Sequence, residues 1–148
     1  MGDAPAGPRD ALGPALRRYL ALYAGGRYFD AHEALETVWR RRPEDPRMVL
    51  LHGLIQWVVA LEHHRRGNAH GARVLLARAW SRLRDPAPGE AALGLDLAPL
   101  RAAHPGIAAA FDRWDRGGPR PALAPPPLAA GGGGAPPPDP PPGAGAAL

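Results

Sequence analysis

Residues that end helices divide most of this chain into segments of helical length. The interruptions fall at Gly25-Gly26, Pro43, Gly67 and Pro86. Between them, apolar side chains recur every three or four residues, as they do along one face of an α-helix. No segment shows the strict alternation that is typical of a half-buried strand. The sequence therefore predicts an all-α fold in which each helix buries its apolar face against its neighbours.

The first two helices have clear start and stop signals. The first is predicted to begin at Asp10 and to end at Gly25, because Asp is a common N-cap and Gly commonly follows a helix. The second is predicted to begin at a capping box formed by Asp30 and Glu33, and to end near Arg42 before a proline. The apolar stripe of the first helix consists of Leu12, Leu16, Tyr19, Leu20 and Tyr23.

The third predicted helix is the most apolar segment of the chain. It opens with Asp45 as N-cap and Pro46 at the first helical position. From Met48 to Leu61 it is apolar on most faces, which indicates a central, buried helix. A short link then leads to a fourth helix capped by Asn68, so these two helices are expected to be antiparallel neighbours. The small residues Gly71 and Ala72 should allow their backbones to approach closely.

The rest of the chain gives weaker signals. Two short helices are expected over residues 96–103 and 105–114, which gives a compact array of about five to six helices. From Pro119 to Leu148 the chain holds eleven Pro, six Gly and eight Ala, without an apolar face that could be buried. We therefore predict a helical domain over residues 10–116 and a disordered Pro/Gly/Ala-rich tail over residues 117–148.

Composition excludes several classes of function. The chain has no cysteine, so disulfides and thiolate metal sites are excluded. Its eighteen basic residues are all Arg, and the formal net charge is +4. Aromatic side chains are not interleaved with the basic ones, and this argues against a nucleic-acid partner. The longest apolar run is shorter than the ~20 residues that a bilayer requires, and no signal peptide is visible. We therefore expect a cytoplasmic protein without a membrane partner.

Polar side chains share a face with apolar ones on the second and third predicted helices. On the second helix, this face holds His32, Leu35, Glu36 and Trp39. On the third helix, it holds His52, Gln56, Val59 and His63. Burying ionisable groups without partners is costly, so the two faces are predicted to meet and to satisfy each other.

Such a meeting is compatible with three roles for these residues. His32 and Glu36 at i and i+4 can both reach one metal ion such as zinc, although the string His32-Glu33-x-x-Glu36 lacks the second His of the zincin motif. Alternatively, His32, Glu33 and Glu36 are catalytic acid–base residues, and the binding residues are Trp39, His52, Gln56 and His63. In the third role, the residues form a purely structural network that fixes how the helices pack.

Three motifs in this region resemble a known family. They read Phe29-x-Ala31-His32-Glu33-x-Leu35-Glu36-x-x-Trp39, then Gly53-Leu54-Ile55-Gln56, then Gly67-Asn68-x-x-Gly71-Ala72. In this order and spacing, between about Tyr28 and Leu83, they are similar to the DUF309 family of small bacterial, archaeal and plastid proteins. The resemblance implies a compact helical array without an established activity. His52 stands where Gln is expected in that family, so the implied residues are His32, Glu33, Glu36, Trp39, Gly53 and Gln56.

Two functional hypotheses follow. The first, which we favour, is a non-catalytic interaction or structural module in which the polar cluster only locks the packing. The second is a metal-binding or hydrolase-type enzyme that uses His32, Glu36 and Gln56. No cofactor is indicated, and the partner class left open is a protein or a small molecule.

Overall fold

Helices make up most of the structure, a computed structural model that describes residues 8–41, 47–86, 90 and 93–130. The helices are α1 (Pro8–Ala24), α2 (Tyr28–Arg41), α3 (Arg47–Arg65), α4 (Ala69–Leu83) and α6 (Ala98–Asp115). Two two-residue strands, β1 (Leu95–Asp96) and β2 (Ala129–Ala130), pair antiparallel. The all-α prediction is confirmed. The predicted cap of α3 at Asp45-Pro46 lies outside the described residues.

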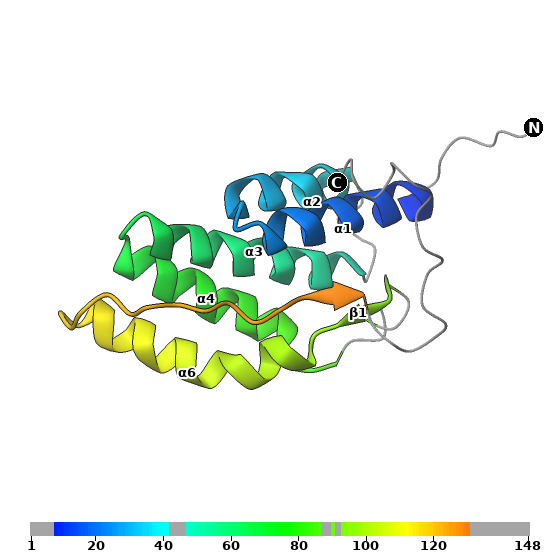
Figure 1. Ribbon diagram of the computed structural model, residues 1–148. Coiled ribbons are helices and arrows are strands. Elements are labelled where there is room, and N and C mark those ends of the chain that lie inside the picture. The colour runs from blue at the N-terminus through cyan, green and yellow to red at the C-terminus, as the bar shows by residue number, and fades with distance from the viewer. Residues whose placement is uncertain (1–7, 42–46, 87–89, 91–92, 131–148) are drawn as a thin grey trace, which may run out of the picture.

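The helices pack in chain order. In Figure 1, α1 and α2 lie side by side at one edge, α3 and α4 follow, and α6 forms the opposite edge. The central position predicted for α3 is confirmed, since most of its side chains between Met48 and Glu62 are buried. Each of the four helices from α2 onward carries one tryptophan. Trp57 of α3 is fully buried, and the other three pack half-buried against the core: Trp39, Trp80 and Trp114.

Glycine and asparagine set the turns between the helices. Gly26 ends the first turn with φ +75° and Gly67 ends the third helix with φ +81°, a left-handed conformation that favours glycine. The predicted cap at Asn68 is confirmed, because the Gly71 N–H donates to its side-chain oxygen over 2.9 Å. The capping box predicted at Asp30 is wrong. Because α2 already begins at Tyr28, Asp30 lies within its first turn and pairs with Arg27 across 2.5 Å.

The last helix is continuous where two short ones were expected. α6 runs through Pro105, which lies near its middle. A proline removes one helical hydrogen bond without forbidding the helix. Here Ile107 and Phe111, which follow the proline, are buried together with Leu100, which precedes it. Shared burial of both halves against one core explains the continuity.

A close approach of α3 to α4 depends on Gly53. A Cβ atom built at this position would lie 2.7 Å from Leu83 Cδ2 and 3.0 Å from Arg82 Cβ. Gly71, at the other end of the same helix pair, would bring a Cβ within 2.8 Å of the His63 ring. The prediction that small residues bring these helices together is confirmed, and Gly53 contributes to it as well.

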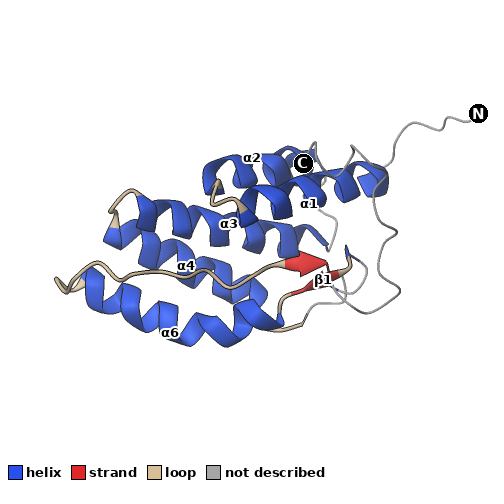
Figure 2. Cartoon of the chain, in the orientation of Figure 1, coloured by secondary structure: helices blue, strands red, loops and turns tan. Residues whose placement is uncertain are grey.

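Residues 117–130, which we call the strap, leave α6 and run back along the domain to β2 (Figures 1 and 2). The Tyr23 hydroxyl donates to the Pro126 carbonyl over 2.7 Å, His64 Nε2 lies 2.7 Å from the Pro121 carbonyl, and Leu128 is buried. The prediction of a disordered tail therefore does not hold for residues 117–130, which pack against the domain. Proline lacks an N–H but keeps its carbonyl acceptor, so a Pro-rich segment can be held by donors of the domain. Residues 131–148 lie outside the described residues.

Within the part of the chain that the structure describes, no helix combines the length and the apolar character needed to span a bilayer.

Candidate functional site

On α2, the predicted site residues contact one another along their own helix. The His32 ring lies with Nδ1 2.7 Å from the Phe29 carbonyl and Nε2 3.5 Å from Glu36. Arg40 approaches the other oxygen of Glu36 at 3.3 Å. Because a carbonyl only accepts, Nδ1 carries the proton that bonds it. The polar groups of His32 and Glu36 are thus engaged by residues of the helix that carries them.

On α3, the polar stripe lies on the side of the helix away from α1. At about 3.6 residues per turn, Leu54, Trp57 and Leu61 face one way and the polar stripe faces the other. Tyr19 of α1 donates its hydroxyl to the Leu54 carbonyl over 2.9 Å, which identifies the side that α1 covers. Of the polar stripe, Gln56 is buried, whereas the other three are half-buried: His52, Val59 and His63. The expectation that both stripes are buried is therefore wrong for the histidines.

The two stripes meet at one aromatic contact. The rings of Trp39 and His52 stack with centroids 4.5 Å apart and planes 30° apart. Among the described residues, no hydrogen bond or ion pair joins His32 or Glu36 to His52 or Gln56. The predicted convergence into one polar cluster therefore needs correction, because each set finds partners elsewhere.

The α3 residues find these partners on α4 and at the turn before it. Arg82 donates to the side-chain oxygen Oε1 of Gln56 over 3.3 Å, and the side-chain nitrogen Nδ2 of Asn68 lies 3.1 Å from His63 Nδ1. Burial lowers the pKa of His52 below its ordinary value of 6.5, and the nearby Arg82 charge lowers it further. Both effects favour the neutral form of the imidazole that lies against the indole of Trp39.

The arrangement offers little for metal chemistry. The described residues contain no group of three or more His, Asp or Glu side chains that could hold one metal ion. They also contain no buried side-chain nitrogen or oxygen without a hydrogen-bond partner. Glu33 is exposed, its backbone carbonyl accepts from the Thr37 hydroxyl, and among the described residues no hydrogen bond or ion pair joins its carboxylate to His32 or Glu36.

Sequence reasoning missed the carboxylate that is most deeply placed. Glu62 is 6% exposed and accepts from Arg65 over 2.6 and 3.0 Å and from Arg66 over 2.6 Å. These hydrogen bonds and charges hold its pKa below the ordinary value of 4.5, and they outweigh the opposing effect of burial. The spacing of one acid followed by two arginines at i+3 and i+4 was the available signal.

Two further histidines have roles that the sequence did not indicate. His64 packs between Phe111 and Trp114 of α6 and bonds the strap at Pro121. His104 lies parallel to Trp80, with centroids 3.8 Å apart, and burial lowers its pKa. In both cases the imidazole serves as a flat packing surface between elements.

Residues 16–75 match the family model of DUF309, a domain of unknown function. Over these residues the chain is similar to DUF309. The resemblance seen in the sequence is confirmed, and the matched region runs from α1 into α4, including both polar stripes.

A relative from another organism matches part of the chain. The uncharacterised protein YpuF of Bacillus subtilis (strain 168) is 42% identical over 69 residues, which cover 47% of this chain and 40% of YpuF. The chain thus spans less than half the length of this relative. No solved structure matches the chain.

Proposed function

We infer that the DUF309 domain is a non-catalytic helical interaction module, in which Trp39 stacked on His52 holds α2 against α3 and Gln56 bonded by Arg82 holds α3 against α4. One observation carries this inference. The polar groups of the two stripes separate into two sets, each hydrogen-bonded or ion-paired to other residues, and Trp39 stacks on His52 where α2 packs against α3. A reaction centre needs groups that converge on one point, and this division works against that.

The half-buried stacking of histidine on tryptophan supports a packing role. The same kind of pair recurs between α4 and α6, where Trp80 stacks on His104. Aromatic pairs of this type stabilise by about 0.5–1.5 kcal/mol beyond the area that they bury. The recurrence supports the use of imidazole as packing material in this fold.

The proposal places the module in the cytoplasm and gives it a protein partner instead of a nucleic acid. A cysteine-free chain needs no oxidising compartment for its folding. The aromatic side chains other than the exposed Phe29 pack within the domain, which leaves few of them to stack on nucleic-acid bases.

The test is the melting temperature of untagged protein, measured in EDTA and with added zinc, for the wild type, Glu36→Gln and Glu33→Gln. Glu36→Gln removes the charge that pairs with His32 and Arg40, at a side chain that is 32% exposed. We therefore expect the free energy of unfolding to fall by up to about 1 kcal/mol. Glu33→Gln, the matched control on an exposed position, should leave the melting temperature unchanged.

Zinc should have no effect on any of the three proteins. A melting temperature that rises with zinc in the wild type and not in Glu36→Gln would establish a metal site, since a ligand that binds only the folded state stabilises it. A Glu36→Gln variant more stable than the wild type would also overturn the proposal, because functional residues are commonly held at a cost in stability.

A further inference from the structure

The α1–α2 edge of the domain carries a groove. One hollow of about 460 Å³ is lined mainly by α1 and by Arg27 in the turn. A second hollow of about 470 Å³ lies between α1 and α2 and reaches Arg41 at the end of α2. Pro14 and Arg18 line both hollows, so the two adjoin, and together we call them the α1–α2 groove.

The floor of the α1–α2 groove is apolar and its rim is basic. Small and aliphatic side chains of both helices supply the floor: Pro14, Ala15, Ala21, Leu22, Ala34 and Val38. Four arginines and two acids also line the groove: Arg17, Arg18, Arg27, Arg41, Asp30 and Glu33. The rim therefore has an excess of positive charge.

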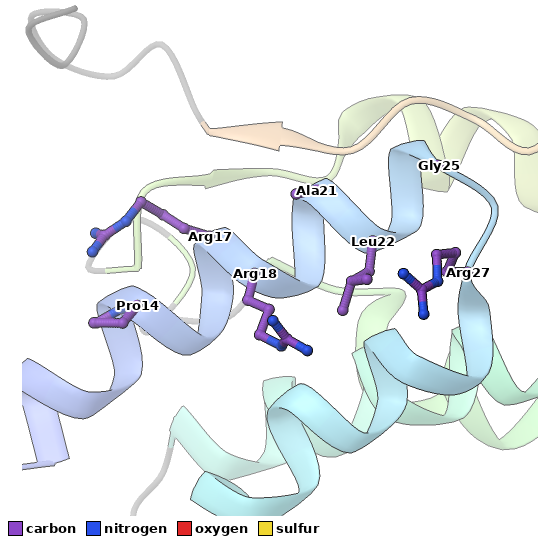
Figure 3. A pocket seen from close by; sticks show the side chains of 7 residues that line it. All are labelled: Pro14, Arg17, Arg18, Ala21, Leu22, Gly25 and Arg27. Atoms are coloured by element: carbon purple, nitrogen blue, oxygen red, sulfur yellow. The ribbon is translucent and has the colours of Figure 1, made fainter. Parts of the chain in front are cut away.

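Part of this charge lacks a counter-charge within the domain. Arg27 is paired with Asp30, but neither Arg17 nor Arg18 forms an ion pair or a side-chain hydrogen bond within the described part of the chain. Figure 3 shows Arg17 and Arg18 extending to different sides of α1, and Leu22 lying between Arg18 and Arg27. Cationic and apolar groups thus alternate along the groove.

This pattern is complementary to an acidic amphipathic helix. The α1 residues that line the groove run from Pro14 to Leu22, a length of about 12 Å or two and a half helical turns. A helix of that length can place apolar side chains on the floor and carboxylates against the arginines, which is the common mode of helix-in-groove recognition. Pairing with carboxylates would also give the partner its orientation and specificity.

Two other occupants fit less well. The groove has no aromatic side chain among its lining residues, whereas single-stranded nucleic acids are bound largely by stacking on aromatic rings. The chain's own C-terminal residues 131–148 include a single acid, Asp139, and therefore cannot supply a row of carboxylates.

We propose that the α1–α2 groove binds an acidic amphipathic helical segment of a protein partner. The proposal rests on the proposed function, because it names the partner class and the surface of the interaction module. The recognising groups are Arg17, Arg18 and Arg27 at the rim and Leu22 on the floor.

The experiment uses the full chain and a fluorescein-labelled peptide of about four helical turns, with Leu on one face and Glu on the other. Its affinity is measured by fluorescence anisotropy at low and at raised salt. The comparison probes are a peptide of the same composition in scrambled order and a labelled oligothymidylate. The variants are Arg17→Gln/Arg18→Gln and the matched control Arg78→Gln/Arg113→Gln, which removes two exposed arginines of α4 and α6.

The amphipathic peptide should bind more tightly than the scrambled one, and salt should weaken the binding. Arg17→Gln/Arg18→Gln should weaken it about tenfold with an unchanged melting temperature, whereas the control variant should bind as the wild type does. Three results would each overturn the proposal. The two variants could bind the amphipathic peptide equally well, the scrambled peptide could bind as tightly as the amphipathic one, or the oligothymidylate could bind more tightly than the peptide. These results leave the proposed function untouched, because that function is tested separately by the effect of zinc and of Glu36→Gln on the melting temperature.

Discussion

The substitution Gly53→Ala adds one methyl group at the point where α3 crosses α4. The new Cβ would lie 2.7 Å from Leu83 Cδ2 and 2.8 Å from Leu83 Cγ, both well inside van der Waals contact. Leu83 is fully buried, so its side chain cannot swing into solvent. The helix pair must therefore separate or the leucine must leave its preferred rotamer.

Two opposing effects set the magnitude. Overpacking of a core costs about 1–3 kcal/mol, whereas replacing glycine by alanine inside a helix gains about 1 kcal/mol. With Arg82 Cβ also only 3.0 Å away, we expect the steric cost to dominate and a net loss of about 1–2 kcal/mol in the free energy of unfolding.

Gly106→Ala is the matched control, because it makes the same chemical change in α6. A Cβ at Gly106 would have no atom within 4 Å, so only the helical gain of about 0.5–1 kcal/mol remains. Urea unfolding of both variants beside the wild type measures the two effects. If Gly53→Ala were as stable as the wild type, or if both variants shifted in the same direction, the close packing of α3 on α4 would be refuted.

Two further predictions concern the strap and the buried acid. A chain that ends at Gly118 should melt several degrees below one that ends at Ala130, because it loses the buried Leu128 and leaves the Tyr23 hydroxyl without its acceptor. Equal melting temperatures would show that the strap adds nothing to stability. Glu62→Gln should cost about 1 kcal/mol at neutral pH, since it removes a charged partner of two exposed arginines. Because the pKa of Glu62 is lowered in the folded protein, its contribution to stability is present above its ordinary pKa of 4.5 and is lost as the pH falls further. The melting temperatures of the wild type and Glu62→Gln should therefore approach each other in acid, and a difference that stays constant with pH would contradict this.

Signals local in sequence predicted the helices well. The glycines that follow α1 and α3 adopt positive φ, and Asn68 caps α4 as its position indicates. The start of α2 was misplaced because Asp30 is also a good first-turn residue, and its partner Arg27 lies outside the predicted helix. Where a helix begins depends on side-chain pairs such as Arg27 and Asp30, and the presence of a capping residue alone does not reveal them.

Contacts between distant segments were beyond the reach of the sequence. The strap is held by single side chains, among them Leu128, and by proline carbonyls, so it has no periodic apolar face that would indicate order. The polar stripe of α3 was placed correctly on one face, but the pattern could not show that this face lies opposite α1 and that Arg82 of α4 reaches Gln56. Residue spacing identifies a face, whereas its neighbour depends on the packing of the whole domain.

The most direct test of the packing account is a double-mutant cycle on the contact that joins the two polar stripes. The four proteins are the wild type, Trp39→Leu, His52→Gln and the double variant, and the quantity measured is the free energy of unfolding at neutral pH. The stacked rings, 4.5 Å apart, should give a favourable coupling energy of about 0.5–1.5 kcal/mol. A coupling energy of zero would contradict the account, because it would mean that the stacking of Trp39 on His52 does not help to hold α2 and α3 together.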